Sequence, residues 1–233
     1  MEVEATVSEG AYGEVLEARA AARVKPRLRG ISHQVGFFAS IPLGVALVVA
    51  VDGGVARLAA AIFATSVTAM FGASAFYHRP TWSPAQRSRL RRLDHAGIFG
   101  LIAGSYTPFG LLVLTGGWRV VVLSIVWAGS AVSIVLRLFW GSMPKWVTAA
   151  IAVTLGWVAV AAFPLIVARI GPAASTLLFT GGACYTLGAL VYASRRPDWW
   201  PATFGYHEVF HALVVVAVAC QYTAVAFFIL PRG

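Results

Sequence analysis

Four polar side chains lie where long apolar runs begin or end, and their types suit metal chemistry. His207 and His211 are four residues apart, so a helix places both imidazoles on one face. His78 ends a second apolar run, and Asp94 opens a third. Three neutral imidazoles suit a tetrahedral zinc site that keeps one position open for water. Such an ion makes hydroxide available near neutral pH, which is the chemistry of a hydrolase.

Asp94 and Ser74 are the candidates for catalytic groups beside such an ion. Ser74 lies one turn before His78 on the same helical face. The Asp94 carboxylate can orient or deprotonate the water, and the Ser74 hydroxyl can hydrogen-bond the water or a substrate carbonyl. Simpler explanations stay open, because a histidine at a helix end is commonly interfacial and Asp94 can be an N-cap that offsets the helix dipole.

Two further histidines, His33 and His95, lie at the starts of apolar runs. We interpret His33 as an interfacial residue or as a supporting residue behind the ligands. His95 points about 100° away from Asp94 on a helix, which makes it a poor candidate for a ligand.

The stretch from His207 to His211 also matches H-E-x-x-H, the zinc metalloprotease motif in which the glutamate is the base. No Asp, Glu or His follows His211, so the third ligand of such a site has to come from upstream. We therefore favour Asp94 as the base. Glu208 is expected to face the lipid headgroups or to hydrogen-bond a ligand.

Membrane-spanning helices have to position these residues. The chain is 59% hydrophobic and 12% charged, whereas soluble domains carry about 25% charged residues. A span needs roughly 20 apolar residues. Seven runs have that length, at about 33–51, 57–78, 94–114, 118–139, 146–167, 173–192 and 207–230. We predict an all-α bundle of seven transmembrane helices over residues 29–233, preceded by a cytoplasmic tail over 1–28.

The distribution of Lys and Arg predicts the orientation of this bundle. The tail and the connection after the second run carry five each, and the connections after the fourth and sixth runs carry two each. The other four of the 18 fall on the opposite side. We expect a cytoplasmic N-terminus, an extracytoplasmic C-terminus and a location in the plasma (inner) membrane. The net charge of +9 is spread over short connections, which argues against nucleic-acid binding.

Two short helices outside the bundle are also expected. One covers about 11–25 in the tail. The other is a basic helix along the inner headgroups, which starts at the capping box Ser83-Pro84-Ala85-Gln86 and precedes the third span.

The pattern as a whole resembles the hemolysin III family, the bacterial branch of the progestin and adipoQ receptor superfamily. The resemblance covers roughly 28–230. The matching stretches are 30–33, 74–78, 93–98, 102–109 and 205–211. In the related adiponectin receptors, zinc is bound through the histidines that match His78, His207 and His211. The aspartate matching Asp94 has a water-mediated role, and the serine matching Ser74 lies nearby.

The resemblance implies a function in membrane lipid homeostasis. The adiponectin receptors are associated with ceramide hydrolysis, and the superfamily includes alkaline ceramidases. We expect a zinc-dependent hydrolase of a lipid amide or ester, with a membrane lipid as substrate. The alternatives are a lipid sensor or receptor in which zinc is structural, and a cytolysin, as the family's name suggests. No span carries a polar stripe for a water-filled lumen, so the cytolysin is the least favoured.

Overall fold

Helices account for almost all regular structure in the part of the chain that is described. The computed structural model describes residues 25–139 and 143–232, and the helix expected over about 11–25 falls outside them apart from Lys25. Within those ranges there is no strand, which confirms the all-α prediction. The helices are α2 (Ile31–Val49), α3 (Gly54–His78), α4 (Pro84–Leu112), α5 (Gly116–Phe139), α6 (Lys145–Gly156), α7 (Phe163–Ser194) and α8 (Tyr206–Ala224).

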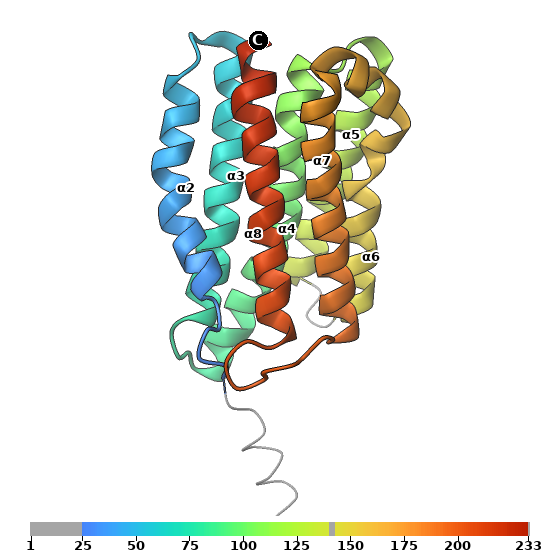
Figure 1. Cartoon of the computed structure of the whole chain (residues 1–233). Coiled ribbons are helices and arrows are strands. Elements are labelled where there is room, and N and C mark those ends of the chain that lie inside the picture. Colours follow the sequence, from blue (N-terminus) through green and yellow to red (C-terminus); the bar gives the residue numbers. More distant parts are fainter. Residues whose placement is uncertain (1–24, 140–142, 233) are drawn as a thin grey trace, which may run out of the picture.

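The helices run side by side along one long axis (Figure 1). Each pair α2–α3, α3–α4, α4–α5 and α7–α8 is in contact, as expected for neighbours joined by short connections. α8 also packs against α2, although 156 residues separate the end of one from the start of the other. The segment that leads from residue 25 into α2 lies at one end of the bundle and the C-terminus at the other (Figure 1). We call the end near residue 25 the basic end.

The predicted runs all correspond to helical structure. Five stretches are long and apolar enough to cross a membrane, and one of them, Lys145–Ser194, is 50 residues long. It contains α6, the 3-10 segment η1 (Val158–Ala162) and α7. α7 is interrupted at Gly171, whose φ of 81° and ψ of 169° suit only glycine. The break separates the fifth predicted run from the sixth. The count of seven crossings and the orientation of the termini stay predictions.

α4 differs from the prediction at its start. The capping box is present: Ser83 Oγ accepts from the Gln86 backbone N at 3.4 Å, and Gln86 Oε1 accepts from the Ser83 backbone N at 3.1 Å. The separate headgroup helix is wrong, because the helix continues without a break to Leu112. No Gly or Pro lies between Ala85 and Asp94 to end it. Asp94 is therefore inside a helix and is not an N-cap.

Small residues bring α3 and α4 close together. A Cβ built on Gly104 would lie 2.1 Å from Ser66 Oγ, so no larger residue fits there without moving a helix. Phe63 and Phe99 are fully enclosed nearer the centre of the bundle. The close approach of the two helices sets Asp94 of α4 beside the last turns of α3.

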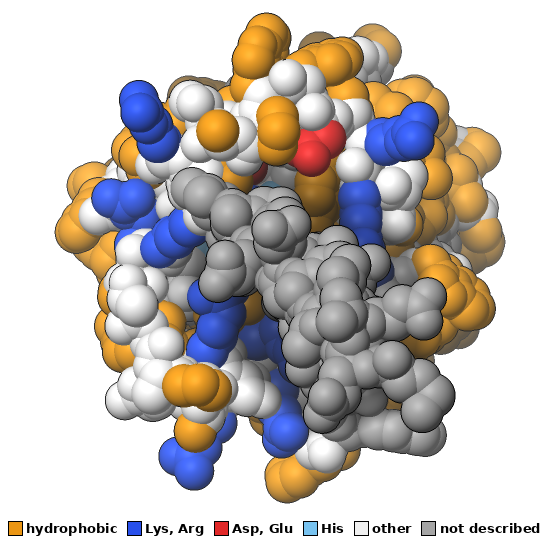
Figure 2. Space-filling model, turned by 90° about the horizontal axis from the view of Figure 1, so that it is seen from below, with side chains coloured by type: hydrophobic (Ala, Val, Ile, Leu, Met, Phe, Trp, Pro, Cys, Tyr) orange, Lys and Arg blue, Asp and Glu red, His pale blue; other side chains and the backbone are white. Residues whose placement is uncertain are grey.

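The outer surface of the bundle is apolar, as a lipid-facing surface has to be. Large apolar side chains on several helices point outward, among them Phe38, Val49, Val120, Leu190 and Phe227. Lys and Arg side chains instead gather at the basic end, which Figure 2 shows face-on.

Candidate metal centre at the basic end

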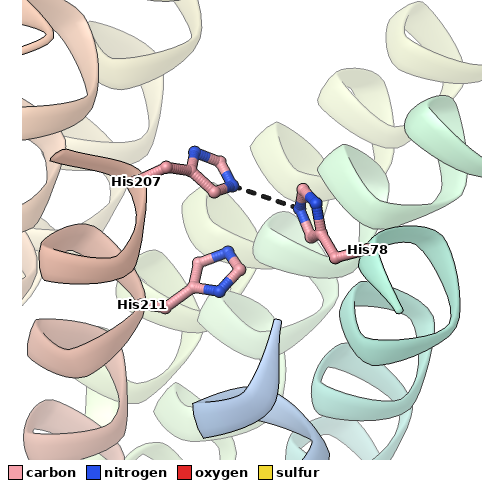
Figure 3. A group of neighbouring side chains, drawn as sticks. All are labelled: His78, His207 and His211. Carbon is pink, nitrogen blue, oxygen red and sulfur yellow. Dashed lines mark hydrogen bonds between the residues drawn. The ribbon is translucent and has the colours of Figure 1, made fainter. Parts of the chain in front are cut away.

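Three histidines from two helices converge near the basic end. His78 ends α3, and His207 and His211 lie in the first two turns of α8. One ring nitrogen of each lies within 4.8 Å of the others, and all three residues are buried. His78 Nε2 and His207 Nε2 are 3.1 Å apart. Figure 3 shows the His78 ring pointing across the gap between the helices toward both rings of α8. The spacing on α8 and the depth of His78 predicted this convergence.

The cluster fits a zinc ion. Zn–N bonds are about 2.0–2.1 Å long, so two ligands of a tetrahedral ion lie about 3.3 Å apart. The separation of the two Nε2 atoms is 3.1 Å, close to that distance, and the ligand atoms of all three residues lie within 4.8 Å of one another. The donor set is also chemically right, because neutral imidazoles are common zinc ligands and need no charge partner in a buried site.

Asp94 lies beside the cluster. Its Oδ2 is 3.6 Å from His78 Nε2, the same atom that faces His207. The carboxylate thus faces the side of the ring on which a metal would bind. Three helices therefore contribute to one site: α3 provides His78 and Ser74, α4 provides Asp94, and α8 provides the His207/His211 pair.

His33 is the residue whose position the sequence left least certain. It is only 2% exposed, so an interfacial role is wrong. Its ring stacks on His211 with centroids 3.8 Å apart and planes inclined by 10°. Its Nδ1 shares a hydrogen bond of 2.8 Å with Ser74 Oγ. His33 therefore supports a predicted ligand and a predicted catalytic residue at once, as a residue behind the ligands.

His95, by contrast, stays outside the cluster. Its Nε2 lies 3.4 Å from the hydroxyl of Tyr192 on α7. This placement agrees with the 100° offset from Asp94 that made His95 a poor ligand candidate.

Glu208 is occupied elsewhere, and both expectations for it are wrong. The residue is 2% exposed, so it does not face the headgroups. Its Oε1 pairs with Arg29 Nε at 2.5 Å, and its Oε2 accepts from the Gly205 backbone N at 2.9 Å. Glu208 thus caps α8 and binds the segment before α2. With both oxygens engaged, it is poorly placed to act as the base of an H-E-x-x-H protease.

An apolar cavity of about 170 Å³ leads away from the cluster into the bundle. His33, Ser74, Asp94, His207 and His211 line its end near the cluster. The rest is lined mainly by apolar side chains of α4, α6, η1, α7 and α8, among them Leu101, Phe109, Val153, Phe163, Leu178 and Phe179. No sequence pattern predicts this cavity, because its wall combines residues from seven elements, α2, α3, α4, α6, η1, α7 and α8.

The family model for haemolysin-III related proteins matches residues 21–222. The chain belongs to this family. Among its haemolysin-III relatives are the hemolysin-3 homolog of Bacillus subtilis (strain 168), which is 29% identical over 85% of this chain and 91% of that protein, and hemolysin-3 of Bacillus cereus, which is 28% identical over 87% and 91%. Membership and the apolar helices together make the chain a multi-pass membrane protein.

The Arg29–Glu208 pair predicts a stability effect in this haemolysin-III family member. Removing Arg29 leaves a buried carboxylate without its cation, which costs 3–5 kcal/mol when both partners are fully buried. Arg29 keeps 22% of its side chain exposed, so we expect Arg29→Met to cost about 2 kcal/mol. Equilibrium denaturation in detergent micelles measures this loss.

Two further variants control this experiment. Arg27 is exposed and lies two residues away, so Arg27→Met should change stability by less than about 0.5 kcal/mol. The double variant Arg29→Met/Glu208→Gln should regain part of the loss, because it removes the unpaired charge. Equal stability of Arg29→Met and Arg27→Met would contradict the importance of the pair.

Proposed function

We propose that the protein is a zinc-dependent hydrolase that cleaves a lipid amide or ester bond. The observation that carries this proposal is the position of the three-histidine cluster, with Asp94 beside it, at the end of an apolar cavity within a membrane-type bundle. A metal centre at the end of an apolar cavity would suit a substrate with a hydrocarbon chain and one polar bond to be hydrolysed.

His78, His207 and His211 would hold the ion. When bound, zinc supplies a Lewis acid that polarises a carbonyl and acidifies water. Asp94 accepts the proton of the attacking water, since its carboxylate lies on the metal-facing side of His78. Ser74 hydrogen-bonds the substrate carbonyl, and its contact with His33 Nδ1 fixes the hydroxyl in place.

The cavity would hold the acyl chain of the substrate. Its lining beyond the cluster is mainly apolar, and the hydroxyls of Ser105, Thr148 and Thr186 already donate to backbone carbonyls. An acyl chain there therefore leaves these hydroxyls paired. The reactive carbonyl is then held next to Asp94 and the histidines, where position alone contributes to the rate.

A lipid sensor with a structural zinc is the second candidate. One observation favours it: the three ligands come from only two helices, α3 and α8, so the ion would also cross-link them. In that case a lipid in the cavity would change the packing of these helices, and no bond would be cleaved.

Metal removal and restoration test the proposal. Purified protein in micelles is incubated with N-acylsphingosine, lysophosphatidylcholine and monoacylglycerol, and released fatty acid is measured by mass spectrometry. We expect release from at least one lipid, loss to the protein-free level after chelation, and recovery on adding one equivalent of zinc. Release that chelation leaves unchanged would exclude the metal mechanism. No release by the zinc-loaded protein, together with lower thermal stability after chelation, would favour the sensor.

A further inference from the structure

A second cavity, which we call the basic vestibule, lies at the basic end. It has a volume of about 470 Å³ and shares Asp94, His95, Tyr192 and His207 with the lining of the apolar cavity. The two cavities therefore meet beside the cluster of His78, His207 and His211. Six cationic side chains line the vestibule: Arg29, Arg87, Arg91, Arg92, Arg137 and Lys145. They come from the segment before α2 and from α4, α5 and α6.

The positive charge of the vestibule is not balanced by protein carboxylates. Arg29 pairs with Glu208, but none of the other five cations has an ion pair within residues 25–139 and 143–232. Among the described residues, Asp94 is the one carboxylate in the lining, and it faces His78. Zinc in the cluster would add two more positive charges at the inner end of this space.

The buried side chain of Arg137 provides the strongest argument for an anion in this space. It is only 5% exposed, and its Nε and Nη2 have no hydrogen-bond partner in the described structure. It lies in the last turn of α5, where the Leu138 carbonyl accepts from Arg92 Nη1 at 2.9 Å and not from Arg137. A buried guanidinium without a partner is costly, so an anion from outside the protein would stabilise it.

Lys145 is held at the same cavity by aromatic rings. Its Nζ donates to the Tyr206 hydroxyl at 2.9 Å and lies 4.6 Å from the centroid of the Tyr192 ring. These contacts fix the ammonium group between α7 and α8 but leave it without a carboxylate.

Membrane topology alone does not account for this arrangement. A basic end that merely faces anionic headgroups needs exposed side chains, and Arg89 and Arg195 are of that kind. Arg137 is buried and lines a cavity that reaches the metal cluster.

We propose that the basic vestibule binds the phosphate of a lipid headgroup, so that the lipid lies with its acyl chain in the apolar cavity and its phosphate beside Arg137 and Lys145. Planar guanidinium groups match phosphate oxygens in a bidentate manner, and several cations suit a phosphate monoester that carries up to two charges. The bond between headgroup and chain then lies at the junction of the two spaces, next to Asp94 and His207. Hydrolysis of that bond rests on the proposed function, whereas the binding of phosphate does not.

A lipid that cannot be hydrolysed separates the two proposals. The full-length protein in phosphatidylcholine nanodiscs is titrated with ether-linked phosphatidate and with the matching ether-linked diglyceride, which has the same chains and no phosphate. Bound lipid is measured by native mass spectrometry. We expect phosphatidate to bind at least ten times more tightly. Arg137→Gln and Lys145→Gln should each weaken its binding by about 10- to 100-fold, the range for a lost hydrogen bond to a charged group.

The matched control is Arg89→Gln on α4, which removes an exposed cation outside the vestibule and should change the affinity less than twofold. Lipid-free Arg137→Gln protein should be as stable as wild type or more stable, since an unpaired buried charge is removed. A loss of stability would instead assign Arg137 a structural role and overturn its part in binding.

Three other results would overturn the proposal. One is equal affinity for phosphatidate and diglyceride. In another, inorganic phosphate binds as tightly as phosphatidate and its binding depends on Arg137 in the same way. That result would identify a free anion as the ligand. The third is a phosphate preference that appears only after the five glutamates of residues 1–17 are replaced with glutamine, which would assign the vestibule to the protein's own tail. Hydrolysis of a neutral lipid without phosphatidate binding would leave the proposed function intact.

Discussion

Replacing His207 or His211 with alanine is expected to remove bound zinc from the protein. Wild type should hold about one zinc per chain, because the three buried histidines form a single cluster. Three protein ligands are the usual minimum for a catalytic zinc site, so losing one should weaken binding by more than the 10- to 100-fold that altered supporting residues cost. His78→Ala should have the same effect from the other helix. Elemental analysis gives the stoichiometry, and titration with a competing chelator gives the affinity.

The two remaining histidines are the controls for this experiment. His95 contacts Tyr192 and not the cluster, so His95→Ala should retain all of the zinc. His33 stacks on His211 and bonds to Ser74, so His33→Ala should weaken zinc binding by about tenfold through the loss of ligand orientation. Unchanged zinc content in the double variant His207→Ala/His211→Ala would disprove the assignment.

The convergence of the three histidines could be predicted from the sequence, because it depends only on residue spacing and on depth along the spans. The i, i+4 spacing places His207 and His211 on one face of α8. The distribution of Lys and Arg predicts that the end of α3 and the start of α8 lie on the same side of the membrane. A membrane-spanning helix has little freedom in depth, so residues at equivalent ends lie at similar heights. Contact between α3 and α8 then required only that the bundle be closed.

Details that depend on side-chain packing could not be predicted. The start of α4 differs from the prediction because basic composition does not mark a separate headgroup helix: a helix continues wherever no breaker interrupts it. The angle of Glu208 on α8 does not reveal its partner, because that partner is Arg29, 179 positions earlier in the chain. For His33 a signal was present: it lies at the same end of its span as the three predicted ligands.

The two cavities could not be predicted either. Each is lined by short pieces of several helices, so its shape depends on how those helices pack against one another. No pattern within a single helix records such a space. The cation-rich lining of the vestibule was visible in the sequence only as a topology signal.

Asp94→Asn is expected to abolish hydrolysis while the protein retains zinc. The asparagine keeps the size of the side chain and loses the ability to accept the proton of water. Loss of a general base typically lowers the rate by 10²–10⁴-fold. Asp94 is not among the three clustered histidine ligands, so elemental analysis should find the wild-type zinc content. Fatty-acid release from whichever lipid the wild-type protein hydrolyses provides the rate.

Glu208→Gln is the matched comparison, because it makes the same chemical change at the other buried carboxylate of the region. Glu208 already binds Arg29 and caps α8, so its loss should reduce stability and lower the rate by at most about tenfold. If Glu208→Gln were inactive and Asp94→Asn retained activity, the H-E-x-x-H mechanism would be favoured and the role of Asp94 would be wrong. If both variants kept zinc and neither changed the rate, proton transfer by a carboxylate would not limit the reaction. The role of Asp94 as the base would then be wrong.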